Sequence, residues 1–147
     1  MDDLHKPKLV GLNHIVLEVG DLTAALDFYH AIFAFRLRGR EDDMAFLDMG
    51  DQFLVLAEGR DQSADKTRHF GLVVDDRSTV PDRVEAAGGR MLDTPFVDFL
   101  DPWGNRVQVV EYRDLQFTKT DAVLEKLCVS PDKSADALAE LDEKGLR

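Results

Sequence analysis

The feature that most constrains the fold of this chain is an internal repeat. The nine residues at 13–21, Asn-His-Ile-Val-Leu-Glu-Val-Gly-Asp, return in altered form at 68–76 as Arg-His-Phe-Gly-Leu-Val-Val-Asp-Asp. The two stretches align without a gap at an offset of 55 positions, the difference between His14 and His69. The same offset matches Leu17, Val19 and Asp21 with Leu72, Val74 and Asp76. A repeat of this length is one supersecondary unit, so the sequence predicts two copies of one module that pack together.

Hydrophobic periodicity predicts the same order of elements, β-α-β-β-β, in each copy. In the first module, about 9–58, we expect strands at 9–18, 35–40, 44–49 and 52–58 and a helix with the apolar stripe Leu22, Ala25, Leu26, Tyr29, Ile32 and Phe33. In the second module, about 68–113, we expect a helix at 78–87 and strands at 68–74, 90–92, 96–100 and 106–112. Residues 1–8 form a polar leader, 59–67 a polar linker and 114–147 a helical extension. The pattern predicts an α+β fold.

Composition limits the partners and the compartment. The net charge of −11 repels phosphate groups, so we expect neither nucleic acid nor a membrane surface as a partner. The leader lacks the apolar core of a secretion signal, and nowhere do about 18 apolar residues run together as a membrane-spanning helix requires. The single cysteine, Cys128, excludes an intramolecular disulfide and suits a reducing compartment. We therefore expect a cytoplasmic protein.

Three motifs carry a resemblance to a known family. They are Asn13-His14 followed by Val19-Gly20-Asp21-Leu22, then His69 followed by Val74-Asp75-Asp76, and finally Phe-Leu-Asp-Pro-Trp-Gly-Asn-Arg at 99–106. In this order, and with this repeat, the chain resembles the vicinal oxygen chelate superfamily, which includes glyoxalase I, extradiol dioxygenases, fosfomycin resistance enzymes and bleomycin resistance proteins. The resemblance implies a single domain at about 9–113, in which the paired modules form a cupped mixed sheet. It also implies a small-molecule ligand and a homodimer.

The resemblance further implies a divalent metal that two adjacent substrate oxygens chelate. The family takes ligands from the first and last strands of each module, and His14 and His69 match the first-strand positions. In the last strand of the second module the family normally has Gly-Asn-x-x-Glu, whereas this chain has Gly-Asn-Arg-Val-Gln, ending at Gln108. The corresponding residue of the first module is Val55, which has no ligating atom. We expect His14, His69 and Gln108 to bind Fe, Mn, Ni or Zn weakly, because an amide replaces the usual carboxylate.

Glu111 is a second candidate for the missing carboxylate. The repeat aligns Glu111 with Glu58, and it aligns Gln108 with Val55. Because Glu111 and Gln108 are three residues apart, they face opposite sides of a regular strand. A triad of the two histidines and Glu111 would therefore require a bulge, and the sequence leaves open whether Glu111 or Glu58 reaches the site.

Four other side chains are candidates for substrate binding. Arg36 and Arg38 alternate with Arg40 along one strand, so we expect a shared face that either meets solvent or binds a carboxylate or phosphate group. Trp103 lies in a tight turn, where we expect it to pack across the sheet end with its indole N–H available to a ligand. Tyr112 has the same strand parity as the amide ligand position, so we expect its phenol to line the cavity.

Two classes of function fit these residues. The first is a metal-dependent lyase, isomerase or dioxygenase of the glyoxalase type that acts on a small oxygenated metabolite. The second is a metal-free protein of the bleomycin-resistance type that sequesters a small molecule, and an acidic chain would suit a cationic ligand in that role. Sensitivity to a chelator separates the two classes.

Overall fold

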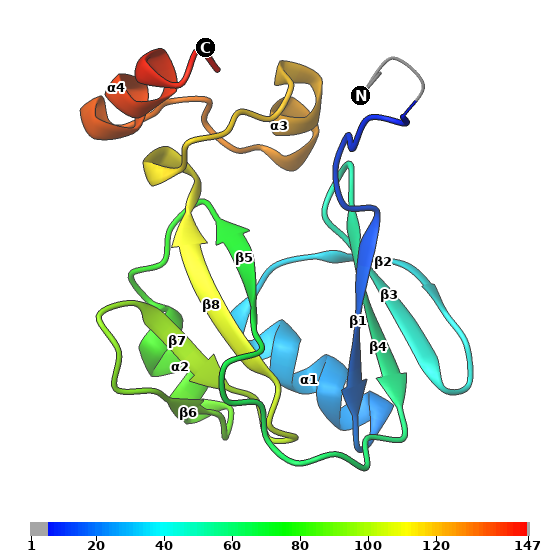
Figure 1. The fold of residues 1–147 in the computed structure, drawn as a ribbon. Helices are drawn as coiled ribbons and strands as arrows, with labels where there is room; N and C mark the ends of the chain where they lie inside the picture. Colours follow the sequence, from blue (N-terminus) through cyan, green and yellow to red (C-terminus); the bar gives the residue numbers. More distant parts are fainter. Residues whose placement is uncertain (1–5, 147) are drawn as a thin grey trace.

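The chain folds as two β-α-β-β-β modules followed by a helical C-terminal extension (Figure 1). The computed structural model describes residues 6–146, so residues 1–5 of the expected leader and residue 147 lie outside the described chain. The first module contains β1 (His14–Val19), α1 (Leu22–Ile32), β2 (Arg36–Arg40), β3 (Met44–Asp48) and β4 (Phe53–Glu58). The second contains β5 (Phe70–Val74), α2 (Val80–Ala86), β6 (Arg90–Met91), β7 (Val97–Leu100) and β8 (Arg106–Glu111). The extension contains a 3₁₀ turn, η2 (Tyr112–Asp114), and helices α3 (Asp121–Leu127) and α4 (Ala135–Glu143). The α+β class and the paired modules are confirmed.

Each module forms its own four-stranded mixed sheet. The strand orders are β1-β4-β3-β2 and β5-β8-β7-β6, so the two sheets have the same topology, as the repeat predicts. In each sheet the first strand of the module pairs in parallel with the last, and the other neighbours are antiparallel. The strands β1 and β5 are therefore edge strands, each with one side of its backbone free of a ladder.

One hydrophobic core runs through both modules. Helix α1 begins at Leu22 because Asp21 Oδ1 accepts a hydrogen bond from Ala24 N at 2.7 Å, which satisfies one of the free amides of the first turn. The predicted apolar stripe of α1 is buried except for Phe33, which is half-buried, and Phe28 is buried as well. Phe28 packs edge-on against Trp103 of the second module, with 6.2 Å between ring centroids. The helix thus packs against its own sheet and against the other module at once.

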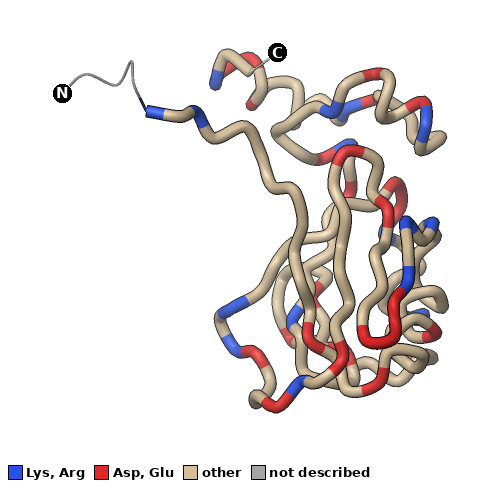
Figure 2. The backbone as a smooth tube through the Cα atoms, turned by 90° about the vertical axis from the view of Figure 1, so that its right-hand side faces the viewer, with Lys and Arg blue, Asp and Glu red and all other residues tan. Residues whose placement is uncertain are grey.

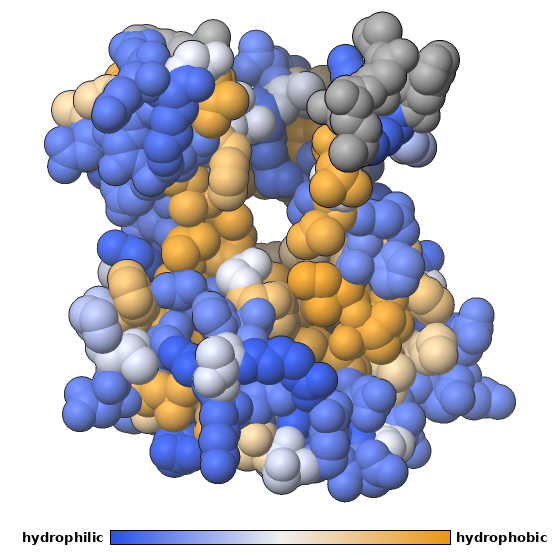
Figure 3. All heavy atoms as spheres, viewed as in Figure 1, coloured by the Kyte–Doolittle hydropathy of each residue, from blue (hydrophilic) through white to orange (hydrophobic). Residues whose placement is uncertain are grey.

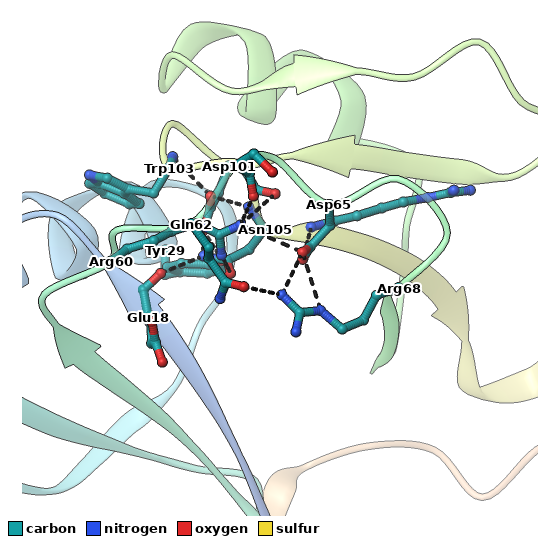
Figure 4. A network of polar contacts seen from close by, with 12 residues as sticks. Glu18, Tyr29, Arg60, Gln62, Asp65, Arg68, Asp101, Trp103 and Asn105 are labelled. Atoms are coloured by element: carbon teal, nitrogen blue, oxygen red, sulfur yellow. Dashed lines mark hydrogen bonds and ion pairs between the residues drawn. The ribbon is translucent and has the colours of Figure 1, made fainter.

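A buried polar network fastens the two modules together (Figure 4). Asn105, in the turn before β8, donates from Nδ2 to the carbonyl oxygen of Glu18 on β1 at 3.0 Å. The Tyr29 hydroxyl on α1 donates to Asp101 Oδ2 at 2.9 Å. Arg60, in the linker, donates to Asn105 Oδ1 and to the carbonyl oxygen of Ser63. The turn that the sequence marks with Asp, Gly and Asn therefore holds together the first module, the linker and the second module.

The expectation of a strand from residue 9 is wrong in its first five residues. Strand β1 begins at His14, whose register partner is Phe53, the first residue of β4. Residues 9–12 lie beyond the start of β4 and have no ladder partner there. Leu9 and Val10 are almost fully exposed, and Figure 2 shows this segment leaving the body of the molecule. Apolar residues in a row predicted a strand, but the length of the neighbouring strand decided where it starts.

A β-bulge in β2 overturns the expectation that Arg36, Arg38 and Arg40 share one face. The register runs from Leu37 opposite Leu47 to Gly39 opposite Phe46, so Arg38 is an extra residue on the bulged strand. The parity beyond the bulge is reversed. Arg40 therefore lies on the helix side of the sheet, where its Nη2 donates to Thr23 Oγ1 at 2.9 Å.

The C-terminal extension is fastened to the end of β8. Lys133 Nζ donates to the carbonyl oxygens of Tyr112 and Phe117 at 2.6 and 2.7 Å, and it lies 3.5 Å from the centroid of the Tyr112 ring. Burial of this ammonium group lowers the pKa of Lys133 from its ordinary value. The described helices include none that is long and apolar enough to cross a membrane.

Candidate functional site

The two sequence-predicted histidines lie on what we call the open face of each sheet, the face turned away from α1 and α2. On β1, Leu17 and Val19 are buried in the core, whereas His14 and Val16 are exposed. His69 is exposed and immediately precedes Phe70, which packs against the core, so it too has the parity of the open face.

Both imidazoles are oriented by an oxygen atom next to Nδ1. His14 Nδ1 lies 2.7 Å from Asn13 Oδ1, and His69 Nδ1 lies 2.8 Å from the carbonyl oxygen of Thr67. Both oxygens can accept a hydrogen bond from Nδ1, and in the tautomer that donates it the lone pair lies on Nε2. Within the described residues neither Nε2 has a hydrogen-bond partner. An oxygen acceptor on one ring nitrogen is the usual support of a metal-binding histidine.

Gln108 lies near His69 on the same open face. Its neighbours along β8, Val107 and Val109, are fully buried in the core, whereas Gln108 is half-buried on the opposite side. Gln108 is the register partner of Gly71, two residues beyond His69. In a parallel pair this places the amide and the imidazole as diagonal neighbours on one sheet surface.

His14 is not brought together with His69 within one chain. Strands β1 and β5 run in opposite directions, so His14, at the start of β1, and His69, just before β5, lie at opposite ends of the two strands (Figure 1). The polar network agrees with this arrangement, since Asn105 is hydrogen-bonded both to Glu18, near the end of β1, and to Arg60 of the linker that leads into β5. In the part of the chain that the structure describes, no three His, Cys, Asp or Glu side chains form a group that could hold a metal ion.

Glu58 and Glu111 serve the helix side of the sheets. Glu58 Oε2 accepts a hydrogen bond from Leu22 N at 3.0 Å, at the start of α1. Its repeat counterpart, Glu111, accepts from Arg77 N at 3.3 Å, in the turn before α2. Strand β8 keeps a regular register from Arg106 to Glu111, so the parity argument is confirmed. Neither carboxylate shares the open face with Gln108.

Sequence analysis missed a carboxylate that does lie beside Gln108. Asp98 on β7 is the register partner of Gln108 and is 1% exposed. Its Oδ2 accepts from Arg106 Nη2 at 2.6 Å and from Thr94 Oγ1 at 3.2 Å, while Oδ1 is buried without a partner among the described residues. The ion pair with Arg106 compensates the charge of Asp98 locally. The signal in the sequence was an acid inside the otherwise apolar run Phe-Val-Asp-Phe-Leu at 96–100, because such an acid is rarely buried unless it is paired.

Arg36 and Arg38 differ in how freely they could bind a substrate. Arg38 Nε donates to Asp48 Oδ1 at 2.6 Å, its Nη2 donates to the carbonyl oxygen of Gly50, and its guanidinium lies 5.4 Å from the centroid of the Phe53 ring. Burial alone would raise the pKa of Asp48, but the hydrogen bonds from Arg38 and from Gly50 N outweigh it and lower that pKa. Arg36 is exposed and makes no such contact with the residues that the structure describes, so its guanidinium is available to an anionic group.

Trp103 and Tyr112 lie in different parts of the molecule. Trp103 packs against Phe28 and so closely against Gly20 that a Cβ at Gly20 would lie 2.7 Å from the indole. Tyr112 is buried, its hydroxyl accepts from Lys119 N at 3.2 Å, and it lines a cavity between the modules. The place of Trp103 is therefore across the sheet end, as expected, whereas Tyr112 lies beyond the end of β8.

Comparisons with known proteins agree with the fold. Residues 11–109 match the sequence profile of the Glyoxalase/Bleomycin resistance protein/Dioxygenase superfamily. A glyoxalase-related enzyme from Fulvimarina pelagi is 22% identical with a TM-score of 0.58, and the match covers 70% of this chain and 88% of that one. The fosfomycin resistance protein FosX from Listeria monocytogenes is 18% identical with a TM-score of 0.61, over 79% of this chain and 98% of that one. A FosX mutant complexed with Mn(II) and 1S,2S-dihydroxypropylphosphonic acid is 19% identical with a TM-score of 0.62, over 69% and 90%. A comparison with curated proteins finds no match.

Proposed function

Because the chain belongs to the Glyoxalase/Bleomycin resistance protein/Dioxygenase superfamily, we propose that it is a metal-dependent lyase, isomerase or dioxygenase that acts on a small oxygenated metabolite. One observation supports this above the others. Both repeat-related imidazoles are exposed, and each is held at Nδ1 by an oxygen atom, which leaves Nε2 free to bind a metal. An oxygen next to Nδ1 recurs at this point of both modules, from the Asn13 side chain in the first and from the Thr67 main chain in the second.

The proposed centre is shared between two subunits of a homodimer. Because His14 and His69 lie at opposite ends of antiparallel strands in one chain, His14 of one subunit would join His69 and Gln108 of the partner subunit. The open faces favour such a pairing, since Val16 is 48% exposed and Val73 41% exposed on the two edge strands. Exposed apolar side chains on unpaired edges are surfaces that another chain can cover. A cytoplasmic location stays a prediction.

In the proposed centre, the metal and the side chains around it would have different roles. A bound divalent metal would supply Lewis-acid stabilisation of an oxyanion on a substrate that offers it two oxygens. The chain itself contributes neutral imidazoles and the Gln108 amide, so an anionic substrate would compensate the charge that a carboxylate ligand normally balances. Arg36, which is exposed and unpaired with any described acid, would bind an acidic group of that substrate.

Metal binding by paired variants tests the proposal. Mn(II) is the first ion to use, because a FosX neighbour was solved with Mn(II). We expect wild-type protein to bind Mn(II) in a calorimetric titration and the His14→Ala and His69→Ala variants each to lose binding at least tenfold. Equal mixing of the two variants after subunit exchange should restore part of the binding, because a mixed dimer has one intact centre. No restoration on mixing would contradict a shared centre, and wild-type protein that binds none of Mn, Fe, Ni and Zn would end the metal proposal.

Gln108 offers a change that should improve the site. Gln108→Glu restores the carboxylate that the family pattern normally has, so we expect Mn(II) affinity to rise by about 10-fold or more. Gln116→Glu adds the same charge in the C-terminal extension and is the matched control. Equal affinity for Mn(II) in both variants would place Gln108 outside the metal centre.

Metal-free binding of a small molecule is the second candidate. It is favoured by the absence of a carboxylate at both last-strand positions, where the chain has Val55 and Gln108. A binder of this class would hold its ligand equally well with and without a chelator and after both histidines are replaced by alanine.

A further inference from the structure

A second candidate site lies between the two modules, at the facing edge strands β1 and β5. It is a cavity of about 360 Å³ between the two modules. Its sides are the facing edge strands β1 and β5, and the C-terminal end of α1 closes the bottom. Of the three proposed metal ligands, His14 lines the cavity, whereas His69 and Gln108 do not. A cavity of this size falls in the range that small-molecule ligands occupy.

The wall of the cavity is mainly apolar. Residues that line it come from α1, from both sheets and from the extension: Ile32, Phe33, Leu54, Phe70, Leu72 and Leu124. Figure 3 shows an opening through the molecule below the C-terminal extension, with hydrophobic residues on both sides of it. Interiors are normally packed without such space, and an apolar cavity of this kind favours an apolar occupant over water.

The C-terminal extension covers the cavity and contacts the first module. Lys119 Nζ pairs with Asp51 Oδ1, in the turn between β3 and β4, at 2.6 Å. At Gly50, in the same turn, a Cβ would lie 3.0 Å from Val123 Cγ1 and 3.2 Å from Leu127 Cδ1 of α3. Helix α3 thus reaches from the end of the second module to a turn of the first. This helix lies outside residues 11–109, which carry the family match.

The charges around the cavity disfavour an anion. Lys119 is the single lysine or arginine among the described lining residues, and it is already paired. Three aspartates also line it: Asp48, which is paired with Arg38, and the exposed Asp75 and Asp76. Hydrogen bonds from Ser78 lower the pKa of Asp76. An anionic ligand would meet carboxylates without a free cation to balance them.

We propose that the cavity between the modules binds an apolar small molecule without an anionic group, and that α3 is the lid of this site. The proposal does not depend on a metal or on any reaction. The Lys119–Asp51 ion pair holds the lid to the first module, so opening the lid breaks that pair and admits the ligand.

Fluorescence of an apolar probe tests the site. N-phenyl-1-naphthylamine, which is uncharged, should bind the full-length protein in the presence of EDTA with a saturable increase in fluorescence. The anionic probe 8-anilinonaphthalene-1-sulfonate should bind at least tenfold more weakly. Val129→Trp, at a half-buried lining position, should abolish binding of the uncharged probe, whereas Phe117→Trp adds the same ring to the extension outside the lining and should not. If Val129→Trp does not fold by circular dichroism, Ala34→Phe is the second filling variant.

The rate of probe entry tests the lid. Lys119→Met removes the ion pair and should raise the stopped-flow association and dissociation rates severalfold. Lys144→Met breaks the ion pair with Glu140 in α4, away from the cavity, and should leave both rates unchanged. Unaltered association and dissociation rates in Lys119→Met would overturn the proposal that α3 is a lid.

Different measurements test the metal proposal and the cavity proposal, so one can be wrong while the other holds. His69→Ala removes a proposed metal ligand but does not touch the lining, so it should bind the uncharged probe normally. Absence of saturable probe binding in wild-type protein, or equal binding by Val129→Trp, would overturn the cavity site whatever the metal titrations give.

Discussion

Tyr29 is the residue at which the packing of the two modules depends most on a single polar contact. Its ring is completely buried on α1, and its hydroxyl donates to Asp101, whose other oxygen accepts from Trp103 N and Asn105 N. Burial raises the pKa of Tyr29 well above its ordinary value, and the neighbouring Asp101 carboxylate raises it further. The raised pKa favours the protonated phenol, which is the form that donates to Asp101.

Removing that hydroxyl should destabilise the protein measurably. We expect Tyr29→Phe to lower the free energy of unfolding by about 1–3 kcal/mol, because Asp101 then loses a buried donor. The protein has two tyrosines, so Tyr112→Phe, which removes a hydroxyl that accepts one longer bond, is the matched control and should have the smaller effect. Urea denaturation measures both. Tyr112→Phe leaves Tyr29 as the single tyrosine, so an alkaline absorbance titration of this variant follows Tyr29 alone. Formation of tyrosinate at pH 10 in the folded variant would contradict the buried hydrogen bond.

Asp65 makes the stability depend on acid pH. Burial alone would raise the pKa of Asp65, but hydrogen bonds from Arg68 and from Arg106 N outweigh it and lower the pKa below its ordinary value of 3.8. A carboxylate with a lowered folded-state pKa adds stability above its unfolded-state value, and this is lost as the pH falls through the folded-state value. We expect Asp65→Asn to lose more stability at pH 7 than at pH 3. Asp61→Asn, in the same linker without these contacts, is the control, and an equal loss for Asp65→Asn at both pH values would refute the linkage.

At the scale of elements, a glutamate at the end of the last strand contacts the chain near the start of the helix in both modules. Glu58 and Glu111 are the last residues of β4 and β8. Glu58 accepts a hydrogen bond from Leu22 N, the first residue of α1, and Glu111 accepts one from Arg77 N in the turn before α2. A carboxylate near the first turn also interacts favourably with the helix dipole. Glu58 therefore supports the first turn of α1, Glu111 supports the turn that leads into α2, and neither side chain belongs to the open face.

Replacing the capping glutamate should affect stability rather than metal binding. We expect Glu58→Ala to lower the free energy of unfolding by about 1 kcal/mol, because Leu22 N loses its acceptor. Glu41→Ala removes the same charge from an exposed turn and should have little effect. Thermal denaturation and an Mn(II) titration on the same samples distinguish the two roles. A loss of Mn(II) binding without a change in stability would indicate that Glu58 is a metal ligand.

At the scale of the whole molecule, the exposed edge strands predict the assembly. The open faces carry Val16 and Val73, and the segment before β1 exposes Leu9 and Val10. We expect a homodimer at micromolar concentration in light scattering, and we expect Val16→Asp or Val73→Asp to shift it toward monomer, because a buried unpaired carboxylate opposes association. Phe117→Asp, at an exposed position in the extension, should remain dimeric. A wild-type monomer would remove the basis for a shared metal centre.

The sequence predicted some features of the fold and of the candidate site, and it missed others. The repeat was enough to predict two equal modules, because period and parity are local properties of the chain: the alternation that buries Val107 and Val109 already separated Gln108 from Glu111. The bulge at Arg38 broke that alternation, since a bulge depends on the facing strand and leaves no reliable local signal.

The candidate site itself was decided mostly by tertiary structure. The sequence by itself marked His14 and His69 as equivalent, but equivalence in a repeat does not say whether two residues meet. Only the antiparallel course of β1 and β5 placed them at opposite ends of one chain, and only the strand pairing put Asp98 beside Gln108. The cavity under α3 was equally unreadable, because it arises between elements that are distant in sequence. Local pattern determined the elements, and long-range packing determined which of their side chains share a space.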